Sequence, residues 1–275
     1  MTSRTLAPSM SSASAFSGSV PEFYDRYMGP WLFEPYAADL VARLPERDEL
    51  EVLEVACGTG IVTRRLREAL PASATLVATD LNEPMVEYAR DAVPDPAIVW
   101  QQADAQALPF EDSSFDVVVC QFGFMFLPDK AQGFREARRV LRPGGVLLGN
   151  VWLSRDENPW ADSVHATVAE LFPADAPRFL ETPYGYFDPE RIHADLAEAG
   201  WDGVQLDDVR LERLAESARD VATGIAKGSP LSFELAERGA DPETVVAELS
   251  QRLAAIGGER PFTAELAATV ISATR

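Results

Sequence analysis

The segment Val52-Leu-Glu-Val-Ala-Cys-Gly-Thr-Gly60 decides how this chain folds. Its apolar first part is typical of a buried strand, and a helical pattern begins directly after Gly60. Gly58 and Gly60 allow the turn to bring its backbone close to a ligand, and the N-terminus of the following helix offers free N–H groups. The segment therefore favours a ligand site at the carboxyl end of a strand.

Short apolar strands alternate with helical patterns around this segment. Strands are predicted over residues 50–55, 74–79, 98–101, 115–120, 145–152 and 204–211, and residues 261–273 form a further strand or helix. Helices are predicted over residues 61–70, 83–92, 130–141, 159–172 and 189–199 and within 217–256. This alternation predicts an α/β fold with a doubly wound, mostly parallel sheet.

The composition argues against several classes of protein. The 275 residues include 24 basic and 44 acidic side chains, for a net charge of −20, which disfavours nucleic acid or an anionic membrane surface as a partner. Only two cysteines are present, and no metal-binding spacing accompanies them. No apolar run approaches the roughly 18 residues of a membrane-spanning helix. We therefore expect a cytoplasmic protein that acts on a small molecule without a metal.

The chain divides into three predicted parts. Residues 1–19 are rich in Ser, Ala and Thr, lack the apolar centre of a signal peptide, and are expected to form a disordered tail. Residues 20–45 are rich in aromatic side chains and predict N-terminal helices that Pro30 and Pro35 break or bend. Residues 46–275 form the main domain, with a helical insertion at about 215–258.

An acidic residue strengthens the prediction of a nucleoside site. Asp80 ends the second predicted strand, where its carboxylate can accept hydrogen bonds from both ribose hydroxyls. A nicotinamide dinucleotide site would have a third glycine where Thr63 stands, which makes a dehydrogenase the weakest alternative. Further along, Asp104 follows the third strand, and Arg142-Pro-Gly-Gly145 precedes the fifth.

With these motifs in this order, residues 50–153 resemble the class I S-adenosylmethionine-dependent methyltransferases. The resemblance is to the small-molecule type, similar to the ubiquinone/menaquinone C-methyltransferases, and it extends more loosely to residues 184–211. It implies a Rossmann-like fold with a seven-stranded sheet, a helical lid, and S-adenosyl-L-methionine as the cofactor. Arg142-Pro-Gly-Gly145 is a structural turn in this family.

The resemblance implies which residues hold the methionine part of the cofactor. Glu54 would hold its polar end through water or backbone amides. The methionine part would lie along the backbone of Ala56, Gly58 and Gly60. The family usually has glycine at the position of Ala56. Gln121 would face the sulfonium and its amino group.

The nucleoside part would contact a second set of residues. Asp80 would accept from the ribose hydroxyls, and Leu81 and Met85 would flank the adenine. Asp104 would accept from the adenine amino group, while the Ala105 N–H would donate to a ring nitrogen. Ordinary helix packing is an alternative role for Met85.

The acceptor side is predicted from aromatic residues. The run Gln121-Phe-Gly-Phe-Met-Phe-Leu127 suits an apolar or aromatic small molecule, with Phe122, Phe124 and Phe126 lining the pocket, unless these rings pack under the next helix. It is not Asn-Pro-Pro-aromatic, which disfavours methylation of nucleobases or amides. Tyr24 would face the acceptor and Tyr27 the cofactor, as tyrosines of the lid helix do in this family.

Methyl transfer from a sulfonium requires mainly positioning, and a general base only for a poorly nucleophilic acceptor. The chain has two histidines. His165 is the candidate base, whereas His193 is expected on the outer surface. A protein that binds the cofactor without transferring its methyl group, such as a cyclase, remains an alternative, and methylation of RNA or protein is disfavoured. A homodimer is compatible with the sequence.

Overall fold

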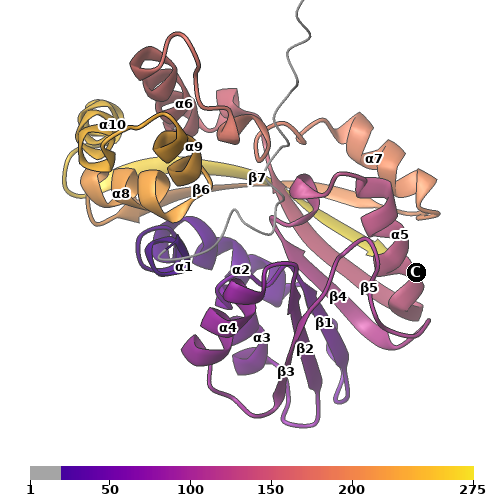
Figure 1. Cartoon of the computed structure of the whole chain (residues 1–275). Helices are drawn as coiled ribbons and strands as arrows, with labels where there is room; N and C mark the ends of the chain where they lie inside the picture. Colours follow the sequence, from indigo (N-terminus) through magenta and orange to yellow (C-terminus); the bar gives the residue numbers. More distant parts are fainter. Residues whose placement is uncertain (1–19) are drawn as a thin grey trace, which may run out of the picture.

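A seven-stranded sheet forms the centre of the molecule, and the structure, a computed structural model, describes residues 20–275 (Figure 1). The strand order is β3-β2-β1-β4-β5-β7-β6. The strands are β1 (Glu51–Val55), β2 (Thr75–Asp80), β3 (Ile98–Gln102), β4 (Phe115–Gln121), β5 (Leu141–Trp152), β6 (Gln205–Ala215) and β7 (Phe262–Thr274). Strands β1 to β5 pair in parallel, and β7 is antiparallel to β5 and β6. The predicted fold class is confirmed; the predicted tail at residues 1–19 lies outside the described residues.

The parallel strands are apolar because helices cover both faces of the sheet. Val52 of β1 pairs with Leu76 on one side and with Val117 on the other, and all three side chains are fully buried. At the edge, β6 alternates between exposed and half-buried positions. The apolar runs of the sequence therefore identify the central strands, and the alternating run identifies the edge.

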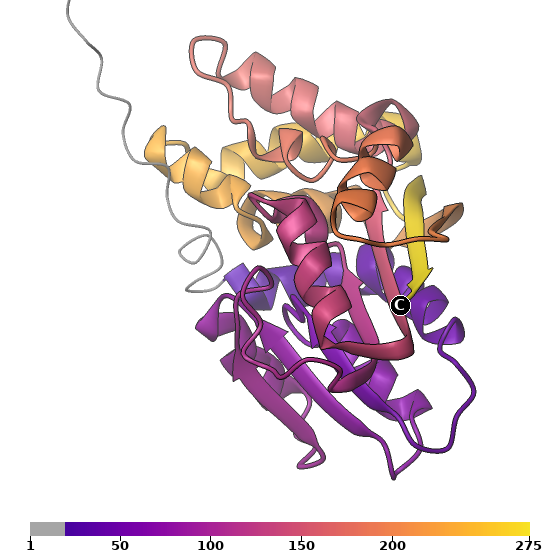
Figure 2. The same ribbon diagram turned by 90° about the vertical axis from the view of Figure 1, so that its right-hand side faces the viewer.

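Helices from different parts of the chain cover the two faces. Helices α2 (Glu34–Ala42), α3 (Ile61–Ala69) and α4 (Glu83–Ala92) lie on one face, and α5 (Lys130–Val140) and α7 (Pro189–Glu198) lie on the other (Figures 1 and 2). The Asp129 carboxylate accepts from the Gln132 N–H and so caps α5, as the Asp188 carboxylate caps α7 by accepting from the Glu190 N–H.

The N-terminal helical segment differs from the prediction at its prolines. Helix α1 (Val20–Phe23) continues into the π-helix η2 (Tyr24–Phe33) and then directly into α2. Pro30 lies inside η2 without breaking the chain, because the wider turn accommodates a residue that lacks an N–H. Pro35 lies in the first turn of α2, where a missing N–H costs nothing.

The remaining helices form a separate group beside the sheet (Figure 1). They are α6 (Pro159–Leu171), α8 (Ala218–Gly228), α9 (Leu231–Glu237) and α10 (Pro242–Gly257), and short 3₁₀ turns η3 (Phe124–Phe126), η4 (Arg155–Glu157) and η5 (Phe179–Glu181) lie in the connections. Helix α8 approaches η2 closely, since a Cβ on Gly228 would lie 2.6 Å from the Tyr24 nitrogen. Within residues 20–275, no helix has the length and apolar character needed to cross a membrane. The predicted boundaries at residues 45 and 215–258 stay predictions.

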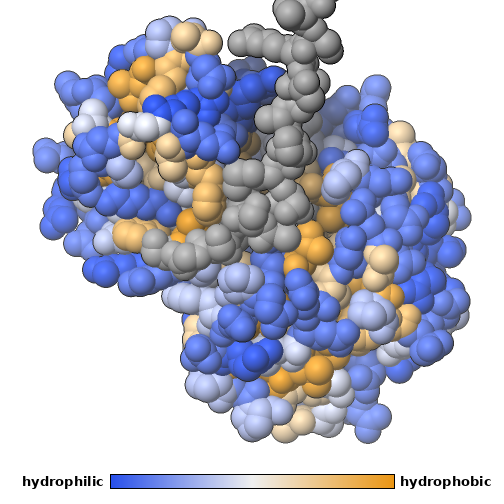
Figure 3. All heavy atoms as spheres, viewed as in Figure 1, coloured by the Kyte–Doolittle hydropathy of each residue, from blue (hydrophilic) through white to orange (hydrophobic). Residues whose placement is uncertain are grey.

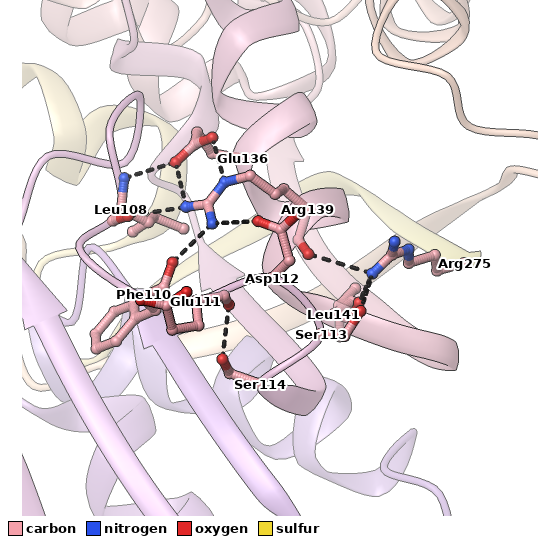
Figure 4. Close-up of polar contacts among 10 residues, drawn as sticks. All are labelled: Leu108, Phe110, Glu111, Asp112, Ser113, Ser114, Glu136, Arg139, Leu141 and Arg275. Carbon is pink, nitrogen blue, oxygen red and sulfur yellow. Dashed lines mark hydrogen bonds and ion pairs between the residues drawn. The ribbon is translucent and has the colours of Figure 1, made fainter.

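The loop between β3 and β4 is fastened to α5 by one arginine (Figure 4). The Arg139 guanidinium donates to the Leu108 carbonyl at 2.9 Å, to the Phe110 carbonyl at 2.7 Å and to Glu136 at 2.8 Å. Glu136 in turn accepts from the Leu108 N–H at 2.8 Å, and Arg275 donates to the Arg139 carbonyl at 3.2 Å. Because the same loop begins with the predicted adenine contacts, this cluster fixes one side of the site.

Candidate active site

The glycine loop turns back toward the sheet through three left-handed residues. Ala56, Gly58 and Gly60 have φ angles of 57°, 55° and 85°. At Gly60 a Cβ would lie 3.2 Å from the Ala89 Cβ of α4, so both the backbone and the packing require glycine. At Gly58 a Cβ would meet nothing within 4 Å, and the backbone therefore faces open space.

Ala56 adopts a conformation that the family usually gives to glycine, and a second glycine makes room for its methyl group. A Cβ on Gly123, which follows β4, would lie only 2.6 Å from the Ala56 Cβ. The departure from the family pattern at Ala56 is therefore accommodated on the side of β4, and the open side of the loop at Gly58 is unaffected.

Asp80 joins the ends of two loops. One carboxylate oxygen accepts from the Gly58 N–H at 2.9 Å, and the other accepts from the Asn82 N–H at 2.8 Å. Only 7% of Asp80 is exposed, and burial raises the pKa of its carboxyl while the surrounding amide donors lower it. The carboxylate is thereby held in one orientation at the tip of β2.

Glu54 is a buried carboxyl group with an unused hydrogen-bonding oxygen. It is 1% exposed, and its Oε2 has no partner among the described residues. Burial raises the pKa of Glu54 to about 8, and nearby Thr63 lowers it only in part. The Oε2 atom therefore has neither a donor nor a positive charge beside it among the described residues.

Two further oxygens at the same place are also without partners. They are the Gln121 Oε1 at the tip of β4 and the Asn82 Oδ1 after β2, both buried. The Gln121 amide donates from its other atom to the Phe33 carbonyl of η2 at 3.3 Å. Unpaired acceptor oxygens beside an open glycine backbone fit the amino group and positive charge of S-adenosylmethionine.

The remaining predicted nucleoside contacts lie along the same edge. The Asp104 carboxylate accepts from the Gln106 N–H at 2.8 Å, and Ala105 is buried beside it. Leu81 is 36% exposed at the tip of β2, whereas Met85 is 3% exposed within α4. We call the strand-tip residues 54–60, 80–85 and 104–105 together with Gln121 the strand-tip rim; their roles toward the cofactor stay predictions.

The lid reaches this rim through a residue that the sequence prediction missed. Asp25 of η2 accepts from the Thr59 hydroxyl at 3.3 Å and from the Tyr88 hydroxyl at 3.4 Å. Tyr27, in contrast, stacks on Phe23 at 5.8 Å, and its Cβ faces α8. In the sequence, Asp25 directly follows Tyr24 on the predicted lid helix. A carboxylate at that position is the signal that could have indicated Asp25 as a site residue.

An aromatic cavity opens next to the rim. Its volume is about 70 Å³, and no charged side chain lines it among the described residues. The lining residues, which define the aromatic cavity, are Tyr24, Met28, Leu32, Phe33, Phe122, Met125, Phe126, Trp152, Trp160, Phe179, Leu180, Pro183, Tyr184, Ile225, Ser229 and Pro230. On the outer surface, apolar residues gather in the band between the helical group and the sheet, amid a mostly hydrophilic surface (Figure 3).

Ring contacts connect the rim to the far wall of the cavity. Tyr24 stacks on Phe33 with ring centres 4.7 Å apart, and Phe33 lies 5.9 Å from Phe122. Phe122 stacks on Trp152 at 3.8 Å, and Trp152 lies 6.0 Å from Tyr184. The negative charge of Asp80 contributes to the raised pKa of Tyr24, which places Tyr24 at the rim end of this series.

The three predicted phenylalanines separate in the structure. Phe122 and Phe126 line the cavity, Phe126 at an exposed position 6.4 Å from Phe179. Phe124 is 1% exposed and packs on Phe134 of α5 with ring centres 4.4 Å apart. For Phe124 the structure therefore shows packing under the next helix, the alternative that the sequence left open.

The histidines lie outside the cavity lining. His165 is half-buried on α6, where burial and the nearby Arg155 lower its pKa. Its Nδ1 is buried without a partner among the described residues. His193 is exposed on α7. The catalytic role predicted for His165 stays a prediction, and the cavity lining does not include it.

Comparison with known proteins agrees with this geometry. Residues 53–149 match the family described as Methyltransferase domain. A ubiquinone/menaquinone biosynthesis C-methyltransferase UbiE of Burkholderia mallei is 31% identical over 189 residues, or 65% of this chain and 78% of that protein. The corresponding protein of Ectopseudomonas mendocina is 33% identical over 167 residues, or 56% of this chain. This chain covers 65% of the Ectopseudomonas protein and 42% of a further relative from Idiomarina loihiensis.

Solved structures support the fold. Phosphoethanolamine N-methyltransferase 2 of Haemonchus contortus, in complex with S-adenosyl-L-methionine, has a TM-score of 0.58 at 17% identity and covers 93% of this chain and 56% of that one. The YcgJ protein of Bacillus subtilis has a TM-score of 0.56 at 18% identity over 88% of this chain and 98% of that one. The [4+2]-cyclase SpnF has a TM-score of 0.57 at 17% identity over 88% and 80%. At these identities the similarity concerns the fold.

The sheet order, the glycine loop and the strand-tip carboxylates define a nucleoside-binding protein of the doubly wound α/β class. Within that class, the chain belongs to the class I S-adenosylmethionine-dependent methyltransferases. The predicted family is confirmed, and with it S-adenosyl-L-methionine, the cofactor that defines this family.

Proposed function

We propose that this protein transfers the methyl group of S-adenosyl-L-methionine to a small, uncharged acceptor of apolar or aromatic character. The aromatic cavity carries this proposal. It borders the strand-tip rim through Tyr24, and its described lining contains no charged side chain. A charged acceptor would lose its hydration there without gaining an ion partner, whereas an apolar ring gains contact area.

The rim residues would hold the cofactor by groups that have no other partner. Glu54 and Gln121 offer unpaired oxygens to the amino group, and the space that a side chain at Gly58 would fill is open. Asp80 is oriented to accept from ribose hydroxyls. When bound, the cofactor supplies an electrophilic methyl group on a sulfonium.

The cavity would contribute positioning and the exclusion of water. Stacked Phe122 and Trp152 offer flat walls for a ring, and Phe126 lies exposed at the mouth. The titratable side chains in the lining are Tyr24 and Tyr184, and burial raises the pKa of both. Both tyrosines therefore act as protonated groups, and neither removes a proton from the acceptor near neutral pH.

Methyl-labelled cofactor tests the proposal directly. The full chain is incubated with labelled S-adenosyl-L-methionine and two panels: neutral phenols and hydroquinones in one, and aliphatic amines and carboxylic acids in the other. Label is expected in the neutral aromatic panel. Phe126→Ala is expected to raise KM for that acceptor severalfold while cofactor affinity stays within twofold, because Phe126 lies at the cavity mouth and outside the rim.

Two results would contradict the proposal. One is cofactor binding without label transfer to any member of either panel, as expected of a cyclase or a binding module. The other is transfer to the charged panel alone. The absence of nucleic-acid binding, a homodimeric state and a cytoplasmic location stay predictions beside this proposal.

A further inference from the structure

Three hydrogen-bond donors in the wall of the aromatic cavity make no hydrogen bond with the described residues: the indoles of Trp152 and Trp160 and the hydroxyl of Tyr184. Trp160 of α6 is 2% exposed, and its indole Nε1 makes no hydrogen bond with the described residues. Tyr184, after η5, is 5% exposed, and none of the hydrogen bonds among residues 20–275 involves its hydroxyl. Both side chains line the cavity, and their rings lie 6.2 Å apart.

The same residue types nearby have their donors satisfied. The Trp31 indole, whose ring lies 5.1 Å from that of Trp160, donates to the Tyr27 carbonyl at 3.0 Å. The Tyr36 hydroxyl donates to the Val209 carbonyl at 3.2 Å. A buried donor without a partner costs about 1–3 kcal/mol. Among the donors of the cavity wall, the fully buried Trp160 indole carries this cost, and the Tyr184 ring lies 6.2 Å from it, so that one ligand atom can pair with both.

The position of these donors gives the ligand a direction. Tyr24 lies at the rim end of the cavity, because it stacks on Phe33, whose carbonyl accepts from the Gln121 amide of the rim at 3.3 Å. Trp160 and Tyr184 make ring contacts with Trp31 and Trp152, and none with Tyr24 among the described residues. A molecule whose reacting atom faces the rim would therefore present its remote end to the two donors.

We propose that Trp160 and Tyr184 determine substrate specificity by donating hydrogen bonds to an oxygen at the remote end of the acceptor. The ligand class is an apolar ring system that carries a carbonyl, ether or comparable acceptor oxygen. This inference rests on the proposed function, since it places the methyl acceptor in the aromatic cavity. Polar selectivity in such a cavity arises from the few groups that can pair with the ligand.

A pair of probes that differ by one carbonyl oxygen tests the proposal. 1-Tetralone and tetralin are titrated into the full chain saturated with S-adenosylhomocysteine, and quenching of tryptophan fluorescence gives Kd. The chain is expected to prefer tetralone at least threefold. Trp160→Phe and Tyr184→Phe, which keep the rings, each leave one donor and are each expected to lower this preference at least twofold, with tetralin affinity within twofold. The double variant has neither donor, so the carbonyl loses its hydration without gaining a hydrogen bond, and the preference is expected to reverse.

Two control variants make the same substitutions at residues outside the cavity lining. Trp31→Phe and Tyr36→Phe remove donors that are already paired and do not line the cavity, so the tetralone preference is expected to persist. Equal affinity for the two probes in the unmodified chain, or an unchanged preference in both cavity variants, would overturn the proposal. The probes report binding alone, so a failure of methyl transfer with the preference intact would refute the proposed function and leave this assignment standing.

Discussion

The strand-tip rim and the aromatic cavity are neighbours that are built in opposite ways. The rim comes from the tips of neighbouring parallel strands and the turns that follow them, held by left-handed backbone and by amide donors to Asp80. The cavity draws its wall from side chains between Tyr24 and Pro230, on six or more separate elements. The rim is left with unpaired acceptor oxygens and the cavity with unpaired donors. The difference teaches that cofactor binding is a local property of this chain, whereas acceptor binding is a property of its assembly.

The largest expected effect separates two phenylalanines of one short segment. Phe124→Ala is expected to lower the free energy of unfolding by about 3–5 kcal/mol, because it empties a fully buried site against Phe134. Phe126→Ala, at an exposed position of the cavity, is expected to cost less than about 1 kcal/mol. Denaturant unfolding measures both. Equal losses would mean that the cavity wall is also part of the structural core.

The second prediction breaks the rim and leaves the cavity intact. Asp80→Asn replaces a carboxylate that accepts from Gly58 and Asn82 with an amide that has half the acceptor capacity. Affinity for S-adenosyl-L-methionine is expected to fall about 100-fold, or about 2.7 kcal/mol, by calorimetry. Tetralone binding is expected to stay within twofold. Loss of both affinities together would show that rim and cavity are one unit.

The third prediction tests whether the rim depends on local backbone or on packing. In Gly60→Ala the new methyl group is placed on a residue with a left-handed φ of 85° and lies 3.2 Å from the Ala89 Cβ. The free energy of unfolding is expected to fall by about 2–3 kcal/mol. In Gly58→Ala only the left-handed backbone is unfavourable, since the Cβ would be in open space. The free energy of unfolding is expected to fall by about 1–2 kcal/mol. Thermal unfolding gives the difference. If Gly58→Ala proves the more destabilising, the packing argument at Gly60 is wrong.

The effect that is smallest per unit of its variable is a pH dependence that arises in the rim. The folded-state pKa of Glu54 is about 8, against about 4.3 in the unfolded chain, so the folded state binds the extra proton between these values. Stability contributed by this carboxyl is complete below about pH 4 and is lost as pH rises through 8, with a slope of at most about 1.4 kcal/mol per pH unit. Glu54→Gln is expected to remove that slope in urea unfolding measured from pH 6 to 9.

The cofactor provides a second measurement of the same group. Binding of the cationic amino group beside Glu54 favours the ionised carboxylate, so binding at pH 7 is expected to release a proton. Calorimetry in buffers of different ionisation enthalpy counts that proton, and Glu54→Gln is the control. An identical proton release in the variant would assign the ionisation to another residue.

The sequence predicted the sheet closely because its determinants are short-range. The apolar run that became β4 was expected over residues 115–120 and is observed at Phe115–Gln121. The path through Pro30 was not predicted, since the π-helix depends on how η2 packs against α8. Residues 261–273 were undecided between strand and helix, and pairing with β5 and β6 settled them as β7.

The site divides in the same manner. Glu54, Gly58 and Asp80 could be identified from spacing because each follows a strand whose end the sequence marks. Asp25 could not, because its contacts to Thr59 and Tyr88 cross from the lid to the rim. Trp160 and Tyr184 had no motif at all, and only their common position in the cavity wall makes them a pair.

By itself the sequence determined the fold class, and its resemblance to a known family determined the family and the cofactor. The fold class follows from periodicity and from glycines at turns, which act within a few residues of one another, and the resemblance rests on the order of the motifs along the chain. Only the tertiary structure decided that Phe124 is core while Phe122 is cavity wall, and that the unpaired indole of Trp160 lies in that wall. The physical reason is that burial and hydrogen-bond pairing depend on elements far apart in the chain, which meet only when the sheet and its helices have assembled.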